Sequence, residues 1–369
     1  MSDITLLSII DSKDKTIFED DNYIIPLYQR AFAWSDKEIT QLIDDIYDFE
    51  AEKYYIGSLI INVNSNEYFS AIPELLDDKK LLKTFTDIID KWKSDKEFSL
   101  KFIKYLLKCR FLFDKYIIKR EYKNEDTTGS WSLKELKVSG ARSKKKPYYR
   151  DTYFGELNEW KTTYSPRTVT NLMLQSCLRV SYTSPKIMHW ITELLKWLNV
   201  DDNLKKLSQF ENQIEIIAQE PVIKFITDKN YMQGVNTPHI VLNYLDYLLW
   251  TKRSDDEYKG LNFDEFSFEF RNSVEHWYPQ HPSSQSFDSW ADVDKFGNLC
   301  IIQRNVNSKF SNLSPASKKD TYRQMIEKGS LKLRLMSSIT EDDAEWKETI
   351  CGKHEEAMLK LLKNACNMA

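Results

Sequence analysis

Glycine is scarce in this chain, which has only nine in 369 residues, and Gly57 is the only one before Gly129. No G-x-G-x-x-G and no P-loop pattern can be drawn, so the usual glycine-rich loops that bind phosphates are excluded. The five cysteines are scattered and odd in number, with no C-x-x-C pair. This spacing argues against a disulfide framework and a thiolate zinc site, and it favours a reducing cytoplasm.

Long apolar runs are also lacking. No stretch of about 18 apolar residues occurs, and no apolar N-terminal segment has a basic flank, so neither a membrane span nor a signal peptide is expected. The formal net charge of −4 excludes a uniformly basic surface, so any contact with nucleic acid must be local. Hydrophobic residues make up 41% of the chain, with 20 Tyr, 19 Phe and 10 Trp, enough for two or three domains with substantial cores.

The first part of the chain, residues 1–72, has the pattern of a small α+β unit. Ser35-x-x-Glu38 forms a capping box, and apolar residues at helical spacing follow it. The segment Tyr54–Val63 is rich in aromatic and β-branched residues and indicates a buried strand.

Residues 73–235 are predicted to be mostly helical. The helix-like stretches are Leu100–Arg120, Met188–Leu198 and Asn203–Gln219. Residues 101–150 contain 15 Lys and Arg against 5 Asp and Glu, a local excess of positive charge. The lysines Lys144, Lys145 and Lys146, in a predicted exposed loop, are candidates for contacts with DNA phosphates. The alternative is a solvated helix face and loop with no ligand.

The third part, residues 236–369, begins with a predicted helix at His239–Trp250 and contains the most informative segment, Val274–Asn312. Glu275 and His276 end a strand-like alternation, and prolines then force a loop. The sequence FGNLCIIQR predicts a turn and a second strand, after which NSKFSNLSPASKKDTYRQMIEKG predicts one helix. A hairpin followed by a helix is the architecture that grips one divalent ion in ββα-metal folds.

The residue types in this segment suit phosphodiester hydrolysis. A neutral imidazole has a pKa of about 6.5, so the side chain of His276 can accept a proton from water. Oxygen ligands from Glu and Asn suit Mg²⁺, which keeps several waters and takes phosphate oxygens in its remaining positions.

The segment resembles the HNH (His-Me finger) nuclease motif, in which D/E-H-I-x-P-Q precedes an N-L…N element. This resemblance implies that Glu275 and Asn307 are ligands of Mg²⁺ or Mn²⁺ and that His276 is the general base. It further implies that Asn298 braces the histidine loop and that Lys318 contacts a phosphate. Trp277 and Tyr278 replace the usual aliphatic pair, a departure within the hairpin.

Other residues compete for these roles. Asn305 and Asn312 are the nearest alternatives to Asn307 as the second metal ligand. His281 follows Pro279 and is predicted to be a loop residue. The remaining histidines are predicted to be core or capping residues on helices: His189, His239 and His354.

The N-terminal stretch IPLYQRAFAW, residues 25–34, resembles the start of the ParB-like domain of GmrSD-type restriction proteins, a family that also carries a C-terminal HNH domain. In that family an Asp-Gly-Gln-Gln-Arg motif follows the strand, but this chain has no Asp-Gly dipeptide. The domain is therefore truncated, and Gln29 and Arg30 lack their expected partners for an NTP. We expect a structural remnant here, with Tyr28 and Trp34 as core aromatics.

These observations predict a predominantly helical α+β protein: a truncated ParB-like unit, a helical middle region and a ββα-metal nuclease domain. The implied function is a metal-dependent endonuclease acting on double-stranded foreign DNA, including modified phage DNA, in a restriction system. One alternative is a catalytically silent homologue that binds DNA or a partner protein, and another is an NTP-binding regulator that uses Arg30. Assembly into a homo-oligomer is left open.

Overall fold

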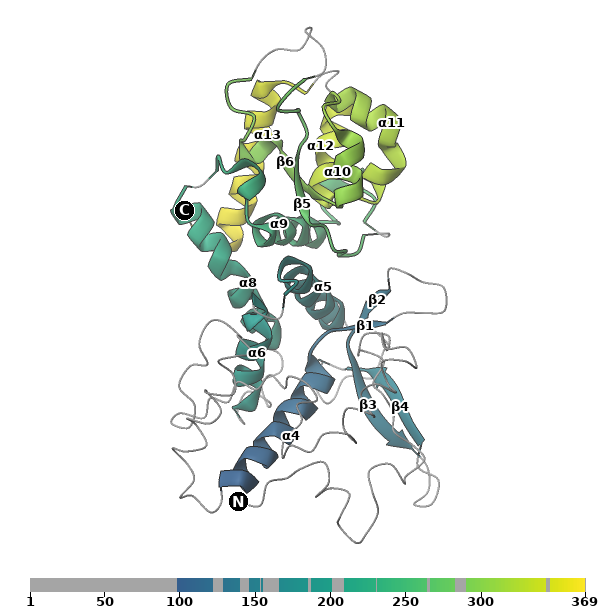
Figure 1. Ribbon diagram of the computed structural model, residues 1–369, viewed down its shortest axis with the longest axis vertical. Coiled ribbons are helices and arrows are strands. Elements are labelled where there is room, and N and C mark those ends of the chain that lie inside the picture. Colours follow the sequence, from purple (N-terminus) through teal and green to yellow (C-terminus); the bar gives the residue numbers. More distant parts are fainter. Residues whose placement is uncertain are drawn as a thin grey trace, which may run out of the picture. The chain divides into compact units, whose positions relative to one another are not determined.

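The computed structural model describes residues 98–121, 129–139, 146–152, 154, 166–184, 187–200, 209–229, 231–263, 266–282, 290–342 and 346–368. The predicted features of residues 1–72, including Gln29 and Arg30, lie outside the described residues, as do Lys144 and Lys145. The described part is predominantly helical with three two-stranded sheets, which confirms the predicted α+β class (Figure 1).

The chain divides into two units. In the smaller unit the structure describes β1 (Lys119–Glu121) and most of β2 (Ser130–Ser132), which pair with each other. The guanidinium of Arg120 lies over the ring of Trp131, 4.4 Å from its centroid. All other described elements belong to the larger unit.

The described part of the larger unit begins with α4 (Phe98–Tyr116). The predicted helix through Arg120 is wrong in its last turn, because the chain leaves the helix after Tyr116. Gln175 explains the end of the helix: its side chain accepts from the backbone N–H of Ile118 and donates to the carbonyl of Tyr116, both at 2.9 Å. A buried side-chain amide from another helix thus satisfies the hydrogen-bonding groups of the backbone at the end of α4.

The described residues of the basic stretch after α4 are not helical either. It contains an antiparallel hairpin of β3 (Lys134–Ser139) and β4 (Lys146–Asp151), in which Lys134 pairs with Asp151 and Ser139 with Lys146. The middle region therefore contains strands that the sequence-based prediction missed.

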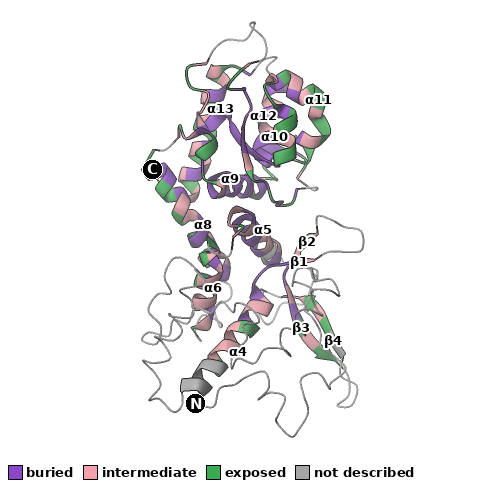
Figure 2. Ribbon diagram, in the orientation of Figure 1, coloured by how far each residue is buried: buried purple, intermediate pink, exposed green. Residues whose placement is uncertain are grey.

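Four helices follow, and the second and the fourth agree with a predicted range to within one residue at each end. The four are α5 (Pro166–Ser181), α6 (His189–Asn199), α8 (Phe210–Thr227) and α9 (His239–Thr251). Helix α8 extends eight residues past the predicted end at Gln219. Every residue of α9 from Ile240 to Trp250 is buried, because the helix packs against α5, α8, α12 and α13 (Figure 2). An apolar helix surrounded by other helices forms the centre of this core.

The C-terminal part contains a hairpin of β5 (Ser273–His276) and β6 (Leu299–Ile302). The helices after it are α10 (Arg304–Phe310), α11 (Pro315–Glu327), α12 (Leu331–Asp342) and α13 (Glu348–Ala365). The single helix predicted after β6 is wrong, since Ser311 takes a φ of 43° and ends α10. The side chain of Ser314 then caps α11 by accepting from the N–H of Ser317.

Short 3₁₀ turns connect several of these elements. They lie at Gly234–Asn236 (η3), Asp256–Tyr258 (η4) and Phe296–Asn298 (η5). Within the part of the chain that the structure describes, no helix combines the length and apolar character needed to cross a membrane.

Candidate functional site

The β5–β6 hairpin brings the acid-histidine pair beside the Gly-Asn-Leu turn. In its antiparallel register Glu275 lies opposite Cys300 and His276 opposite Leu299. Glu275 and His276 are 8% and 5% exposed, so both side chains are shielded from bulk water. The pair therefore lies at the end of β5, where the strand leaves the hairpin.

Asn298 is fully buried and holds the loop that follows His276. Its side-chain oxygen accepts from the backbone N–H of Tyr278 at 2.8 Å, and its amide nitrogen donates to the carbonyl of Tyr278 at 2.9 Å. The same nitrogen donates to the carbonyl of Val293, also at 2.9 Å. One amide thus ties together both arms of the loop, the geometry expected of a bracing residue.

The imidazole of His276 contacts a residue that sequence reasoning missed. Nε2 of His276 lies 2.7 Å from Oδ1 of Asp294, which also accepts from the side chain of Gln280 at 3.2 Å. Asp294 stands four residues before Asn298, and only its nearness to the Gly-Asn-Leu turn could have suggested it. Gly234 packs directly on this carboxylate, and its N–H donates to the carbonyl of Asp294 at 3.3 Å.

Lys318 does not lie where the phosphate contact would require. Its side chain has no solvent exposure, and its ammonium donates to Oε1 of Glu275 at 2.8 Å. It also donates to the carbonyls of His276 and Trp277 at 2.6 and 3.1 Å. Burial raises the pKa of Glu275 and lowers the pKa of Lys318. The lysine, near the start of α11, is therefore a buried ion-pair partner of Glu275.

Of the three candidate asparagines, only Asn307 has a side chain that forms a hydrogen bond with β5. Its amide nitrogen donates to the hydroxyl of Ser273, which stands two residues before Glu275 on the same face of the strand. Asn305 and Asn312 are exposed. Within the described residues, the amide oxygen of Asn307 and Oε2 of Glu275 have no protein partner.

This donor set fits a hard divalent cation. Among the residues that the structure describes, no three His, Cys, Asp or Glu side chains gather into a metal cage. Mg²⁺ needs no such cage, because it is commonly held by one or two protein oxygens and completes its shell with water and phosphate. One carboxylate and one amide oxygen therefore suit Mg²⁺ better than Zn²⁺, whose sites use nitrogen and sulfur ligands.

Buried polar side chains of α12 form hydrogen bonds with the hairpin and with the turn η5. The ammonium of Lys332, on α12, donates to the carbonyls of Phe296 and Leu299, and the backbone N–H of Lys332 donates to Oδ1 of Asp246 at 2.8 Å. Burial lowers the pKa of Lys332 to about 8. The indole N–H of Trp277 donates to the hydroxyl of Thr340 at 3.0 Å. Helix α12 thus fixes both ends of the turn that carries Asn298.

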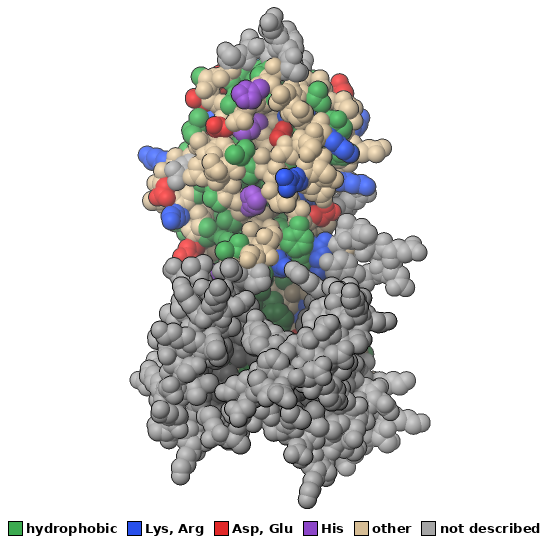
Figure 3. All heavy atoms as spheres, viewed as in Figure 1, with side chains coloured by type: hydrophobic (Ala, Val, Ile, Leu, Met, Phe, Trp, Pro, Cys, Tyr) green, Lys and Arg blue, Asp and Glu red, His purple; other side chains and the backbone are tan. Residues whose placement is uncertain are grey.

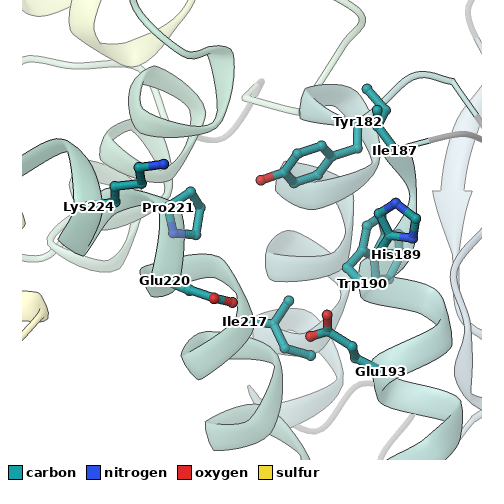
Figure 4. Close-up of a pocket in the computed structure, with 9 residues that line it drawn as sticks. All are labelled: Tyr182, Ile187, His189, Trp190, Glu193, Ile217, Glu220, Pro221 and Lys224. Carbon is teal, nitrogen blue, oxygen red and sulfur yellow. The ribbon is translucent and has the colours of Figure 1, made fainter. Parts of the chain in front are cut away.

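The other histidines do not join this site. His281 is exposed in the loop, as predicted, and His354 is buried against Trp346. His239 begins α9 and is partly buried, and burial lowers its pKa. His189 is exposed rather than in a core: it lines a cavity of about 370 Å³ with Tyr182, Glu193 and Glu220 (Figure 4).

The described part of the basic segment carries less free charge than its composition suggests. Glu135 is 4% exposed and forms ion pairs with Lys115, Lys137 and Arg150. Lys146 lies in β4, next to the undescribed Lys144 and Lys145. On the face drawn in Figure 3, the basic and acidic side chains of the described residues are interspersed.

The comparison with known families identifies the segment that contains the site. Residues 222–361 match the family described as GmrSD restriction endonucleases, C-terminal domain. The matched range covers less than half of the chain, but it includes Glu275, His276, Asn298 and Asn307. No curated protein and no solved structure shows a significant match to the chain.

This segment is therefore similar to the C-terminal domain of restriction endonucleases, which indicates a nuclease role in restriction. The match begins before the predicted domain boundary at residue 236 and does not reach residues 1–72. The predicted ParB-like unit stays a prediction.

Proposed function

We propose that this protein is a metal-dependent endonuclease of the HNH type that cleaves foreign double-stranded DNA in a restriction system. The observation that carries the proposal is the convergence of Glu275, His276, Asn298 and Asn307 on one hairpin and its following helix. This convergence lies inside the segment that is similar to restriction endonucleases. Phage DNA, including modified DNA, is the substrate class that restriction implies.

In the proposed mechanism His276 accepts a proton from the water that attacks the phosphodiester. Asn298 keeps the backbone beside His276 in place through its two hydrogen bonds to Tyr278. Shielding of the imidazole from bulk water strengthens its interactions with neighbouring charges. The positioned base can contribute roughly 100- to 10,000-fold to the rate.

Glu275 and Asn307 would hold Mg²⁺ or Mn²⁺ through their unpartnered oxygens. When bound, the cation neutralises charge that develops on the phosphate and on the leaving oxygen. Lys318 occupies only Oε1 of Glu275, which leaves Oε2 for the cation. The lysine also offsets the negative charge of Glu275 before the metal arrives.

The experiment is a plasmid-nicking assay with Mg²⁺ and Mn²⁺ in separate reactions. We expect metal-dependent nicking that falls at least 100-fold in His276→Ala, because the base is lost. The matched control is His281→Ala, which removes an exposed imidazole five residues away and should keep wild-type activity. Equal nicking by wild type and His276→Ala would contradict the assignment of the base.

A second candidate is a catalytically silent homologue that binds DNA or a partner protein. The observation that favours it is the 2.8 Å bond from Lys318 to Glu275, because an internal cation already pairs with the proposed metal ligand. DNA binding without nicking in either metal, unchanged in Glu275→Gln, would support this candidate over the nuclease.

A further inference from the structure

We infer that Asp294 is a positioning residue that selects the tautomer of His276 and thereby assigns Nδ1 as the atom that accepts the proton. The inference rests on the proposed nuclease function. Oδ1 of Asp294 lies 2.7 Å from Nε2 of His276. A carboxylate can only accept at this distance, so Nε2 carries the hydrogen and the lone pair is on Nδ1.

The position of Asp294 is set by its backbone as well as by its side chain. Gly234 in η3 has a φ of 52°, and its N–H donates to the carbonyl of Asp294 at 3.3 Å. A Cβ placed on Gly234 would come within 2.4 Å of Oδ1 of Asp294. The glycine is therefore required both by its backbone conformation and by the carboxylate that packs on it.

The same amide that braces the histidine loop also reaches the aspartate. Asn298 binds the carbonyl of Val293, next to Asp294, and the backbone of Tyr278, two residues after His276. One buried side chain thus fixes the spacing between the two members of the dyad. The contact between His276 and Asp294 is therefore held by the backbone on both sides and not by the two side chains alone.

The charges around the aspartate leave it able to act on the imidazole. Among the residues that the structure describes, Gln280 is the other side chain bonded to Oδ1, and it is neutral. The neighbouring Lys295 is paired with Glu348 at 3.0 Å and lies 3.7 Å from Asp292, so the structure assigns its ammonium to those acids. In the reaction the water proton moves to Nδ1 while the Nε2 proton stays in its bond to Asp294. The carboxylate then stabilises the imidazolium that has formed.

Two substitutions at Asp294 separate this role from a structural one. Asp294→Asn keeps the shape and an oxygen that can still accept from Nε2, but it loses the negative charge that stabilises the imidazolium. We expect nicking to fall about 10-fold in this variant. Asp294→Ala removes the acceptor as well and should fall further, about 100-fold, the scale of a lost general base. A purely structural role predicts that the near-isosteric Asn keeps wild-type nicking.

The matched control is Asp292→Asn, the same chemical change two residues away at a side chain that the structure pairs with Lys295 rather than with histidine. It should keep wild-type nicking. If Asp294→Asn is as active as this control, the inference is overturned.

Nitrogen-15 NMR of histidine-labelled, metal-free full-length protein tests the tautomer without any turnover. We expect the His276 resonances of the wild type to report hydrogen on Nε2 and a hydrogen bond from that atom, and those of Asp294→Ala to report the loss of this hydrogen bond. Identical spectra for the two proteins would overturn the inference. A wild type that shows the Nε2 tautomer but never nicks DNA would support the positioning role and contradict the proposed function instead.

Discussion

The side chain of Lys318 is fully buried. Its ammonium donates hydrogen bonds to Glu275 and to two backbone carbonyls. Such a pair is not a simple source of stability, because both charges lose their hydration. Its consequence is asymmetric: removal of one partner leaves the other buried without compensation.

We predict that Lys318→Met lowers the free energy of unfolding by about 3–5 kcal/mol, since Glu275 is then left unpaired. Urea denaturation at neutral pH measures this loss. The double variant Lys318→Met with Glu275→Gln should recover part of it, because no buried charge remains. A single variant as stable as the wild type would show that the pair is not buried as described.

Asp246 is a second buried acid, and burial raises its pKa to about 6 despite a hydrogen bond from the backbone N–H of Lys332. The folded state therefore holds a proton that the unfolded state loses between about pH 4 and 6. Stability must fall as pH rises through this window, by up to about 3 kcal/mol for a shift of about two pKa units.

We predict that Asp246→Asn removes this pH dependence. The amide oxygen can still accept from the N–H of Lys332, so the variant should equal or exceed the wild type in stability at pH 8. The two proteins should converge near pH 4. Thermal melts across pH 4–8 measure the difference, and parallel curves would contradict the raised pKa.

At the scale of elements, the site depends on the contact between η3 and the loop before β6. This contact places Gly234 against Asp294, about 60 residues away in sequence. The turn η3 leads directly into the buried helix α9, so the dyad is anchored to the core of the larger unit.

We predict that Gly234→Ala lowers both stability and nicking. The positive φ alone costs about 1 kcal/mol for alanine, and the new methyl group must displace the Asp294 carboxylate. The matched control is Gly260→Ala, whose Cβ would meet nothing within 4 Å. Melting temperature and nicking rate are measured for both, and similar losses in the two variants would contradict the steric argument.

At the scale of the whole molecule, the net charge is negative, whereas one segment carries a local excess of positive charge. The chain totals −4, whereas residues 101–150 contain 15 basic and 5 acidic side chains. Glu135 neutralises part of this excess through its ion pairs. If this segment binds DNA, the contacts with phosphates must come from lysines that do not form ion pairs with acidic side chains.

We predict that replacing Lys144, Lys145 and Lys146 with alanine weakens DNA binding and makes it less sensitive to salt. Each lost phosphate contact reduces the slope of log K against log salt by about 0.9. Titrations by fluorescence anisotropy at several salt concentrations measure the slope. The control replaces three exposed lysines elsewhere, Lys328, Lys353 and Lys360, and should keep the wild-type slope.

Local patterns predicted several elements well. Helix α9 follows from a turn before a long apolar run, and α6 from helical spacing of large apolar residues. Prediction was wrong where a distant side chain decided the outcome, as at the end of α4, where Gln175 binds the backbone. It was also wrong after β6, where Ser311 interrupts what periodicity alone made one helix.

The sequence by itself determined which chemical groups stand together along the hairpin: Glu275 beside His276, and Asn298 and Asn307 at their spacing. That information is local, because neighbouring residues and turn signals lie within a few positions of one another. Only the tertiary structure decided which side chains pair with Glu275 and His276. It buried Lys318 against Glu275 and set Asp294 at 2.7 Å from His276, since burial and hydrogen bonding depend on groups brought together through space.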